Sequence, residues 1–162
     1  MKRILLGLCI VVSLLFGGCA PAAEDYFAPF AGDFEAEFAG EFRGMEIAAV
    51  ICMQAGNAEG VREATLTFYA PQALAGTVLT RDAYGNLQLT SGEVSISGKA
   101  VEGYAPLLSL FPCEGAIHTV KLEQGYTRVE GEGFGITFCA DGTPIKAENC
   151  EIVADVIRFE RK

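Results

Sequence analysis

The sequence has no tryptophan, one histidine and no cluster of basic residues. It contains 12 lysines and arginines against 21 aspartates and glutamates, with a formal net charge of −9 at pH 7. A surface of this charge repels the phosphate backbone of DNA and RNA and the headgroups of anionic lipids. We therefore expect no nucleic-acid partner and no flat contact with an anionic membrane surface.

Motifs that support catalysis are also scarce. The sequence contains no Gly-x-Ser-x-Gly elbow and no Cys-x-x-Cys pair. Cys113 and His118 offer a nucleophile and a base, but no third residue can be assigned to orient them. Asp141 and Glu148 supply oxygen ligands, yet they lack a recognisable metal-binding loop. We predict that the protein is not an enzyme and has no cofactor or metal.

An apolar segment without charge lies near the N-terminus, where Met1, Lys2 and Arg3 precede residues 4–18. It has about 15 residues, whereas a helix that crosses a bilayer needs roughly 20. A basic start followed by an apolar segment of this length is typical of an export signal. The segment thus predicts export from the cytoplasm.

This segment ends in Leu15-Phe16-Gly17-Gly18-Cys19, which resembles the lipobox of bacterial lipoproteins. The small residues admit the extended backbone to a peptidase, and the cysteine thiol accepts diacylglycerol. The resemblance implies that residues 1–18 are a signal peptide and that Cys19 is the lipid-carrying first residue of the mature chain. The alternative is an uncleaved membrane anchor with an incidental cysteine.

Residues 19–32 are predicted to form a lipidated, flexible tether, because residues 20–25 are small, polar and proline-containing. Loss of the signal removes Lys2 and Arg3, which leaves 10 basic against 21 acidic side chains, a net charge of −11. We expect a single domain, residues 33–162, that its acyl chains attach to the extracytoplasmic side of the cell membrane.

Four cysteines remain beside Cys19 in the mature chain: Cys52, Cys113, Cys139 and Cys150. An even number outside the cytoplasm is compatible with two disulfides. Two of the four lie in apolar, strand-like segments, where buried free thiols are common. Both interpretations stay open.

The mature chain has a pattern of strands and turns. In residues 33–43 the side chains of Phe34, Phe38 and Phe42 share one parity, and acidic or basic residues take most of the other, which indicates a half-buried strand. Residues 46–53 are apolar at both parities and predict a strand covered on both faces. Further strands are expected at residues 61–69, 76–82, 87–90, 93–97, 117–123, 126–130, 135–140, 144–148 and 151–159.

Only one helix is predicted, over residues 104–111, where Gly103 and Pro112 limit it to about two turns. About ten antiparallel strands without crossover helices indicate a mainly β fold. We expect an antiparallel curved sheet, or open half-barrel, with the short helix as its lid or plug.

This order of elements resembles LolA/LolB-like carriers and the related LppX lipoproteins. The likeness rests on an A-x-L-x-F-x-A-P-x-x-L-x-G segment at residues 64–76 and on the turn Asp141-Gly142-Thr143-Pro144. The resemblance implies a half-barrel whose concave face holds acyl chains under helical lids.

The apolar face of a curved sheet must be covered, and apolar clefts with few polar groups suit lipids. The sequence therefore predicts a cavity for a lipid, an acyl chain or another hydrophobic ligand. An ordinary filled core is the alternative, in a protein-interaction or envelope-stress-sensing module with an envelope protein as partner. The candidate cavity residues are Phe34, Phe38, Phe42, Leu66, Phe68, Leu107, Leu108 and Phe111.

Overall fold

The computed structural model describes residues 26–162. The predicted signal peptide, Cys19 and the first part of the predicted tether lie outside the described residues. Within residues 26–162, no helix has both the length and the apolar character needed to cross a membrane.

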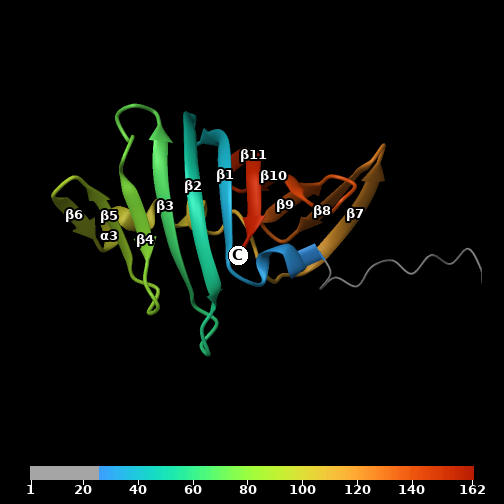
Figure 1. The fold of residues 1–162 in the computed structure, drawn as a ribbon, viewed down its shortest axis with the longest axis horizontal. Coiled ribbons are helices and arrows are strands. Elements are labelled where there is room, and N and C mark those ends of the chain that lie inside the picture. Colours follow the sequence, from blue (N-terminus) through green and yellow to red (C-terminus); the bar gives the residue numbers. More distant parts are fainter. Residues whose placement is uncertain (1–25) are drawn as a thin grey trace, which may run out of the picture.

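Eleven antiparallel strands form one unclosed sheet in the order β6-β5-β4-β3-β2-β1-β11-β10-β9-β8-β7 (Figure 1). The predicted mainly β, open half-barrel fold is confirmed. The strands are β1 (Phe34–Phe42), β2 (Met45–Gly56), β3 (Arg62–Ala70), β4 (Val78–Arg81), β5 (Leu87–Ser91), β6 (Val94–Ser97), β7 (Ile117–Glu123), β8 (Tyr126–Gly131), β9 (Phe134–Phe138), β10 (Pro144–Asn149) and β11 (Ile152–Arg161).

Strand β1 lies at the centre of this sheet and joins its two halves. It pairs with β2 on one side, Phe38 opposite Ala49, and with β11 on the other, Phe38 opposite Val156. The register of β1 against β11 shifts between Glu37 and Phe38, and such a bulge bends a strand and increases its twist. The bulge therefore adds to the curvature at the middle of the sheet.

The alternation of side chains along β1 sets which face of the sheet is buried. Phe34, Ala36, Phe38 and Phe42 are buried, whereas Glu41, at the other parity, is exposed. Most of β3 repeats this pattern, and the inward side chains of both halves join one apolar core. We call the buried side of the sheet its concave face and the other side its convex face.

Residues 98–115 connect the two ends of the sheet, because they lie between β6 and β7, which are at opposite ends in Figure 1. We call them the lid segment. It contains two four-residue helices, α3 (Lys99–Glu102) and α4 (Ala105–Leu108). The single helix predicted over residues 104–111 is thus too long at its C-terminal end, and α3 was missed.

The ends of α4 have a local cause. Pro106 stands within its first turn, where its missing N–H removes no helical hydrogen bond. After Leu108 the chain leaves the helix, yet Leu110 and Phe111 remain buried. Their burial comes from contact with the sheet and not from helical periodicity, so the apolar pattern extends beyond the helix.

One other prediction needs correction. Strand β2 is fully buried only on the face of Ile47, Ala49 and Ile51, because the opposite parity lies on the convex face. A short 3₁₀ helix, η1 (Ala28–Phe30), places Phe30 in the core, so structured residues precede residue 33 within the described chain.

The four cysteines of the described chain, Cys52, Cys113, Cys139 and Cys150, are all free. The sequence left open whether these cysteines form disulfides or remain free, and in the structure they are free thiols. The fold is therefore held by its sheet and its core without covalent links among residues 26–162.

The close approach of β1 and β11 at Gly40 leads to a prediction for the stability of this sheet. Gly40 lies opposite Ala154 in β11, and a Cβ at Gly40 would overlap the Val153 carbonyl oxygen and come within 2.6 Å of Ala154 Cα. We expect Gly40→Ala to lower the free energy of unfolding by about 2 kcal/mol, because the two strands must separate.

Urea denaturation measures this loss. The control is Gly32→Ala, because nothing lies within 4 Å of a Cβ built at Gly32. It should change the stability by less than about 0.5 kcal/mol. Equal effects of the two substitutions would show that β1 and β11 do not approach as closely as described.

Candidate ligand-binding site

The eight predicted cavity residues come together on the concave face. Each is at most 3% exposed, and all belong to one cluster of buried side chains. Five come from β1 and β3, and three come from the lid segment. The structure thus places the lid segment directly on the aromatic face of the sheet.

Phe111 is the centre of this contact. Its ring centroid lies 5.6 Å from that of Phe30, 5.6 Å from that of Phe34 and 6.3 Å from that of Phe38. Phe159 of β11 completes the group at 6.5 Å. Aromatic pairs at these separations add to the stabilisation from burial alone. Phe111 therefore fixes the lid segment to the middle of the sheet.

Sequence reasoning missed Phe30 and Phe159 as members of this cluster. Phe30 lies within the predicted tether, and Phe159 is the last residue of a predicted strand. The usable signal for Phe30 was the aromatic content of residues 26–30, which is unusual for a flexible spacer.

The polar attachment of the lid segment to the sheet is sparse. The side-chain amide Nδ2 of Asn149, at the end of β10, donates to the Pro106 carbonyl oxygen over 2.8 Å. Glycines with positive φ stand at both ends of the segment, Gly98 at 76° and Gly115 at 149°. Glycine adopts this backbone region without the steric cost that other residues meet.

Two clefts flank the lid segment. The first, of about 670 Å³, lies towards β9 and β10 and is lined by Pro106, Phe134 and Asn149 among others. The second, of about 410 Å³, lies towards β2 and β3 and is lined by Met53 and Arg62. Of the eight predicted cavity residues, Leu108 and Phe111 line the second cleft, and none lines the first. The centre of the concave face is filled, and open volume lies beside the lid segment.

Two arginines share the concave parity with this apolar cluster, and sequence reasoning assigned them no role. Arg62 begins β3 and is 6% exposed, and Arg81 ends β4 and lines both clefts. Burial, with a smaller effect of the Arg62 charge, lowers the pKa of Arg81. The alternation of buried positions along β3 and β4 was the signal that could have found them.

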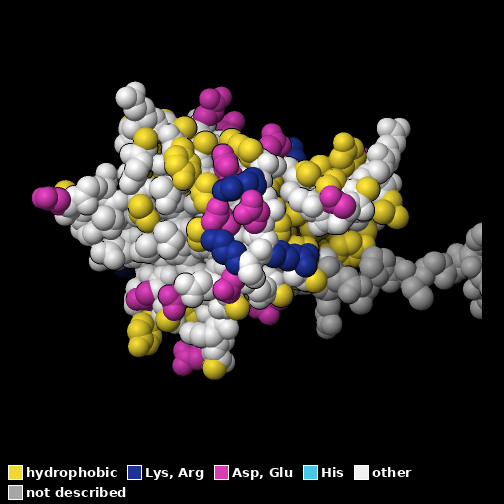
Figure 2. Space-filling view, in the orientation of Figure 1, with side chains coloured by type: hydrophobic (Ala, Val, Ile, Leu, Met, Phe, Trp, Pro, Cys, Tyr) yellow, Lys and Arg dark blue, Asp and Glu magenta, His cyan; other side chains and the backbone are white. Residues whose placement is uncertain are grey.

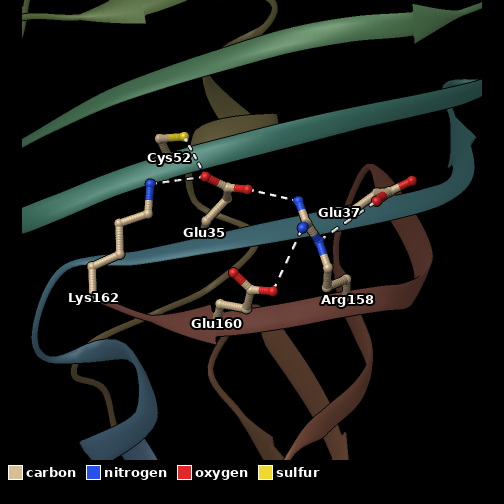
Figure 3. Close-up of polar contacts among 6 residues, drawn as sticks. All are labelled: Glu35, Glu37, Cys52, Arg158, Glu160 and Lys162. Atoms are coloured by element: carbon tan, nitrogen blue, oxygen red, sulfur yellow. Dashed lines mark hydrogen bonds and ion pairs between the residues drawn. The ribbon is translucent and has the colours of Figure 1, made fainter.

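The convex face carries a network of charges around Glu35 (Figure 3). The Glu35 carboxylate accepts hydrogen bonds from Lys162 Nζ at 2.8 Å, Arg158 Nη2 at 2.7 Å and the Cys52 thiol at 3.5 Å. The bonds from Lys162 and Cys52 lower the pKa of Glu35, while burial raises the pKa of the Cys52 thiol. Figure 2 shows the charged side chains gathered on this face.

These convex ion pairs are largely exposed, so each contributes little to stability. Their position matters more, because it separates a charged outer face from an apolar inner face. A hydrophobic ligand would therefore be expected on the concave side.

The two carboxylates considered for metal binding, Asp141 and Glu148, have other partners. Asp141 accepts from the Cys139 thiol and the Thr143 N–H, which lower its pKa to about 2. Glu148 is paired with Arg128, and His118 is exposed on β7. Within residues 26–162, no group of three or more His, Cys, Asp or Glu side chains is placed to hold a metal ion.

No protein-family model and no curated protein matches the sequence. Among solved structures, an uncharacterised conserved protein from Thermus thermophilus is similar, with a TM-score of 0.50 and 12% identity. The alignment covers 85% of this chain and 84% of that one. At this identity the likeness shows a common fold and nothing about the ligand.

Two further structures are similar at lower scores. MucB has a TM-score of 0.49 and 15% identity, with 90% of this chain and 60% of that chain covered. A LolA superfamily protein from Nitrosomonas europaea has a TM-score of 0.41 and 8% identity, over 88% and 94% of the two chains. At these scores and identities the two likenesses concern the fold alone.

Proposed function

We propose that this protein is a non-enzymatic half-barrel that binds a lipid or another hydrophobic ligand on its concave face. The main observation in support is that the wide apolar face of the sheet is covered by only 18 residues, 98–115, which contain two single-turn helices. In this proposal the described form is closed, and the ligand takes the place of part of the lid segment.

The energetic balance is compatible with such an exchange. Lifting residues 107–111 of the lid segment exposes Leu107, Leu108, Leu110 and Phe111, which are at most 2% exposed. At about 1.5–3 kcal/mol for each side chain, this costs roughly 6–12 kcal/mol. An acyl chain regains about 0.8 kcal/mol per buried CH₂, so about 8–15 methylenes offset the cost. Common fatty acyl chains have this length.

The open volume supports the same proposal. The two clefts, of about 670 and 410 Å³, have the size of ligand sites in proteins, about 300–1,000 Å³. Both end at the lid segment, so a displaced lid would join them across the aromatic centre of the sheet.

The second candidate is a protein-interaction or envelope-stress-sensing module with a filled core. The observation in its favour is that all eight predicted cavity residues are already packed together. The two candidates differ in one property, because the second requires no exchange between the lid segment and a ligand.

Asn149 allows a test that affects the lid segment and little else. Its Oδ1 accepts from the N–H groups of Glu151 and Ile152, and its Nδ2 donates to Pro106. Asn149→Asp keeps the acceptor and removes the donor, so it weakens the lid contact, and its added charge lines the first cleft and not the second. Asn57 is a matched control, since its Oδ1 accepts from two N–H groups and its Nδ2 donates to Ala83 outside the lid segment.

The experiment uses residues 20–162, a fluorescent fatty acid and mass spectrometry of co-purified lipid. We expect the wild type to bind the fatty acid, and Asn149→Asp to bind it about 5–10 times more tightly, because one hydrogen bond no longer opposes opening. Asn57→Asp should match the wild type. Wild-type protein that is free of lipid and takes up no fatty acid would refute the proposal and favour the filled-core module.

We further propose that Cys19 carries the lipid anchor and that the domain lies on the extracytoplasmic side of the cell membrane. The lipobox resemblance at residues 15–19 supports this placement. Full-length protein expressed in a bacterium with an alkyne-labelled fatty acid should become labelled and partition with the membrane. Cys19→Ser should abolish the labelling, because the acyl acceptor is lost, whereas Cys9→Ser, within the predicted signal, should not. Labelling of the Cys19→Ser protein would contradict the assignment.

A further inference from the structure

The concave face is apolar except where β3 and β4 bring Arg62 and Arg81 beside the lid segment. In β3, Arg62 has the parity of Ala64 and Leu66, and in β4, Arg81 has the parity of Leu79. These are positions where a half-buried strand ordinarily carries apolar side chains. Two cations at such positions need an explanation.

Arg62 has a structural explanation. Its Nε donates to the Gln54 carbonyl oxygen at 2.8 Å and its Nη2 to the Gly32 carbonyl oxygen at 2.9 Å. Its guanidinium also lies over the Phe34 ring, 5.4 Å from the centroid. These contacts attach the start of the domain to β2, but none of them neutralises the charge.

Only some of the N–H donors of the Arg81 guanidinium have hydrogen-bond partners. Its Nε donates to the Arg62 carbonyl oxygen at 2.7 Å, and its Nη2 lies 3.6 Å from the Met53 sulfur. Nη1 makes no hydrogen bond within residues 26–162. Every buried side-chain nitrogen and oxygen of that part of the chain has a partner, so Nη1 of this half-buried residue must be accessible to solvent.

Neither arginine forms an ion pair in the described part of the chain. Arg43, Arg128 and Arg158 each pair with a glutamate, and Arg161, which has no ion pair in this part of the chain either, is exposed, so Arg62 and Arg81 differ from the other arginines in being unpaired and at least partly buried. Removing a guanidinium from water is costly unless an anion accompanies it. For Arg81, no carboxylate of the described chain offsets this cost of desolvation. The clefts that Arg81 lines leave room for an incoming anion.

We propose that Arg81 binds the anionic group, a carboxylate or a phosphate, of an amphipathic ligand whose apolar chain enters beneath the lid segment. The Arg62 charge strengthens this attraction. The proposal rests on the proposed function and names its ligand class. Glu114 lines the same two clefts, and its charge opposes the anion. Glu102 and Glu132 also line the first cleft, so the second cleft is the better position for the anionic group.

The test compares ligands with the same chain and different headgroups: palmitate, hexadecyl phosphate and hexadecanol. Competition with a fluorescent fatty alcohol gives their affinities for residues 20–162. We expect the two anions to bind wild-type protein at least about 10 times more tightly than hexadecanol, as a hydrogen bond between charged groups implies. Arg81→Gln should remove this preference and leave hexadecanol binding unchanged.

Two further variants control for folding and for general charge. Arg81→Lys keeps the positive charge and should retain part of the preference, even if it loses the hydrogen bond to the Arg62 carbonyl. Arg158→Gln removes a cation from the convex face and should leave the preference intact. Glu114→Gln should increase the affinity for palmitate and not for hexadecanol.

The outcomes separate this proposal from the proposed function. Binding of hexadecanol and palmitate with equal affinity, or a preference unchanged in Arg81→Gln, overturns the anion site and leaves hydrophobic binding standing. Failure of all three ligands to bind overturns the proposed function. Competition by inorganic phosphate at the concentrations at which hexadecyl phosphate competes would assign the site to a free anion and overturn the assignment to a lipid headgroup.

Discussion

The contact between Phe111 and the aromatic centre of the sheet is the interaction on which the rest of the structure depends. An unclosed sheet of eleven strands leaves its apolar face open to water unless another part of the chain covers it. Here the cover is the lid segment, and Phe111 reaches Phe30, Phe34 and Phe38 together. The position of α4, the burial of η1 and the two flanking clefts all follow from that contact.

The distribution of charge complements this arrangement. On the convex face, Arg158 and Lys162 both pair with Glu35, so these charged groups have partners within the chain. On the concave side Arg62 and Arg81 have no carboxylate partner within residues 26–162, although the whole chain is acidic. The two faces are therefore suited to different tasks, solvation outside and an amphipathic ligand inside.

Local pattern was sufficient to predict most of the sheet. Strand β7 has the predicted bounds, and the alternation of Phe34 and Glu35 gives the correct buried face of β1. The local sequence pattern did not predict the burial of residues that depends on tertiary contacts. Phe30 follows a spacer and Phe159 lies in an alternating strand, so neither shows from its neighbours that it packs against Phe111. The roles of Arg62 and Arg81 also required the pairing of β3 with β4, which places Ala64 opposite Arg81.

The central claim is that a ligand and the lid segment compete for the same apolar face. Amide hydrogen exchange, measured with and without saturating palmitate, tests it most directly because each backbone segment reports its own opening. We predict faster exchange in residues 98–115 when palmitate is bound, with β1 and β2 as protected as before or more so. Slower or unchanged exchange in residues 98–115, with palmitate demonstrably bound, would contradict the claim.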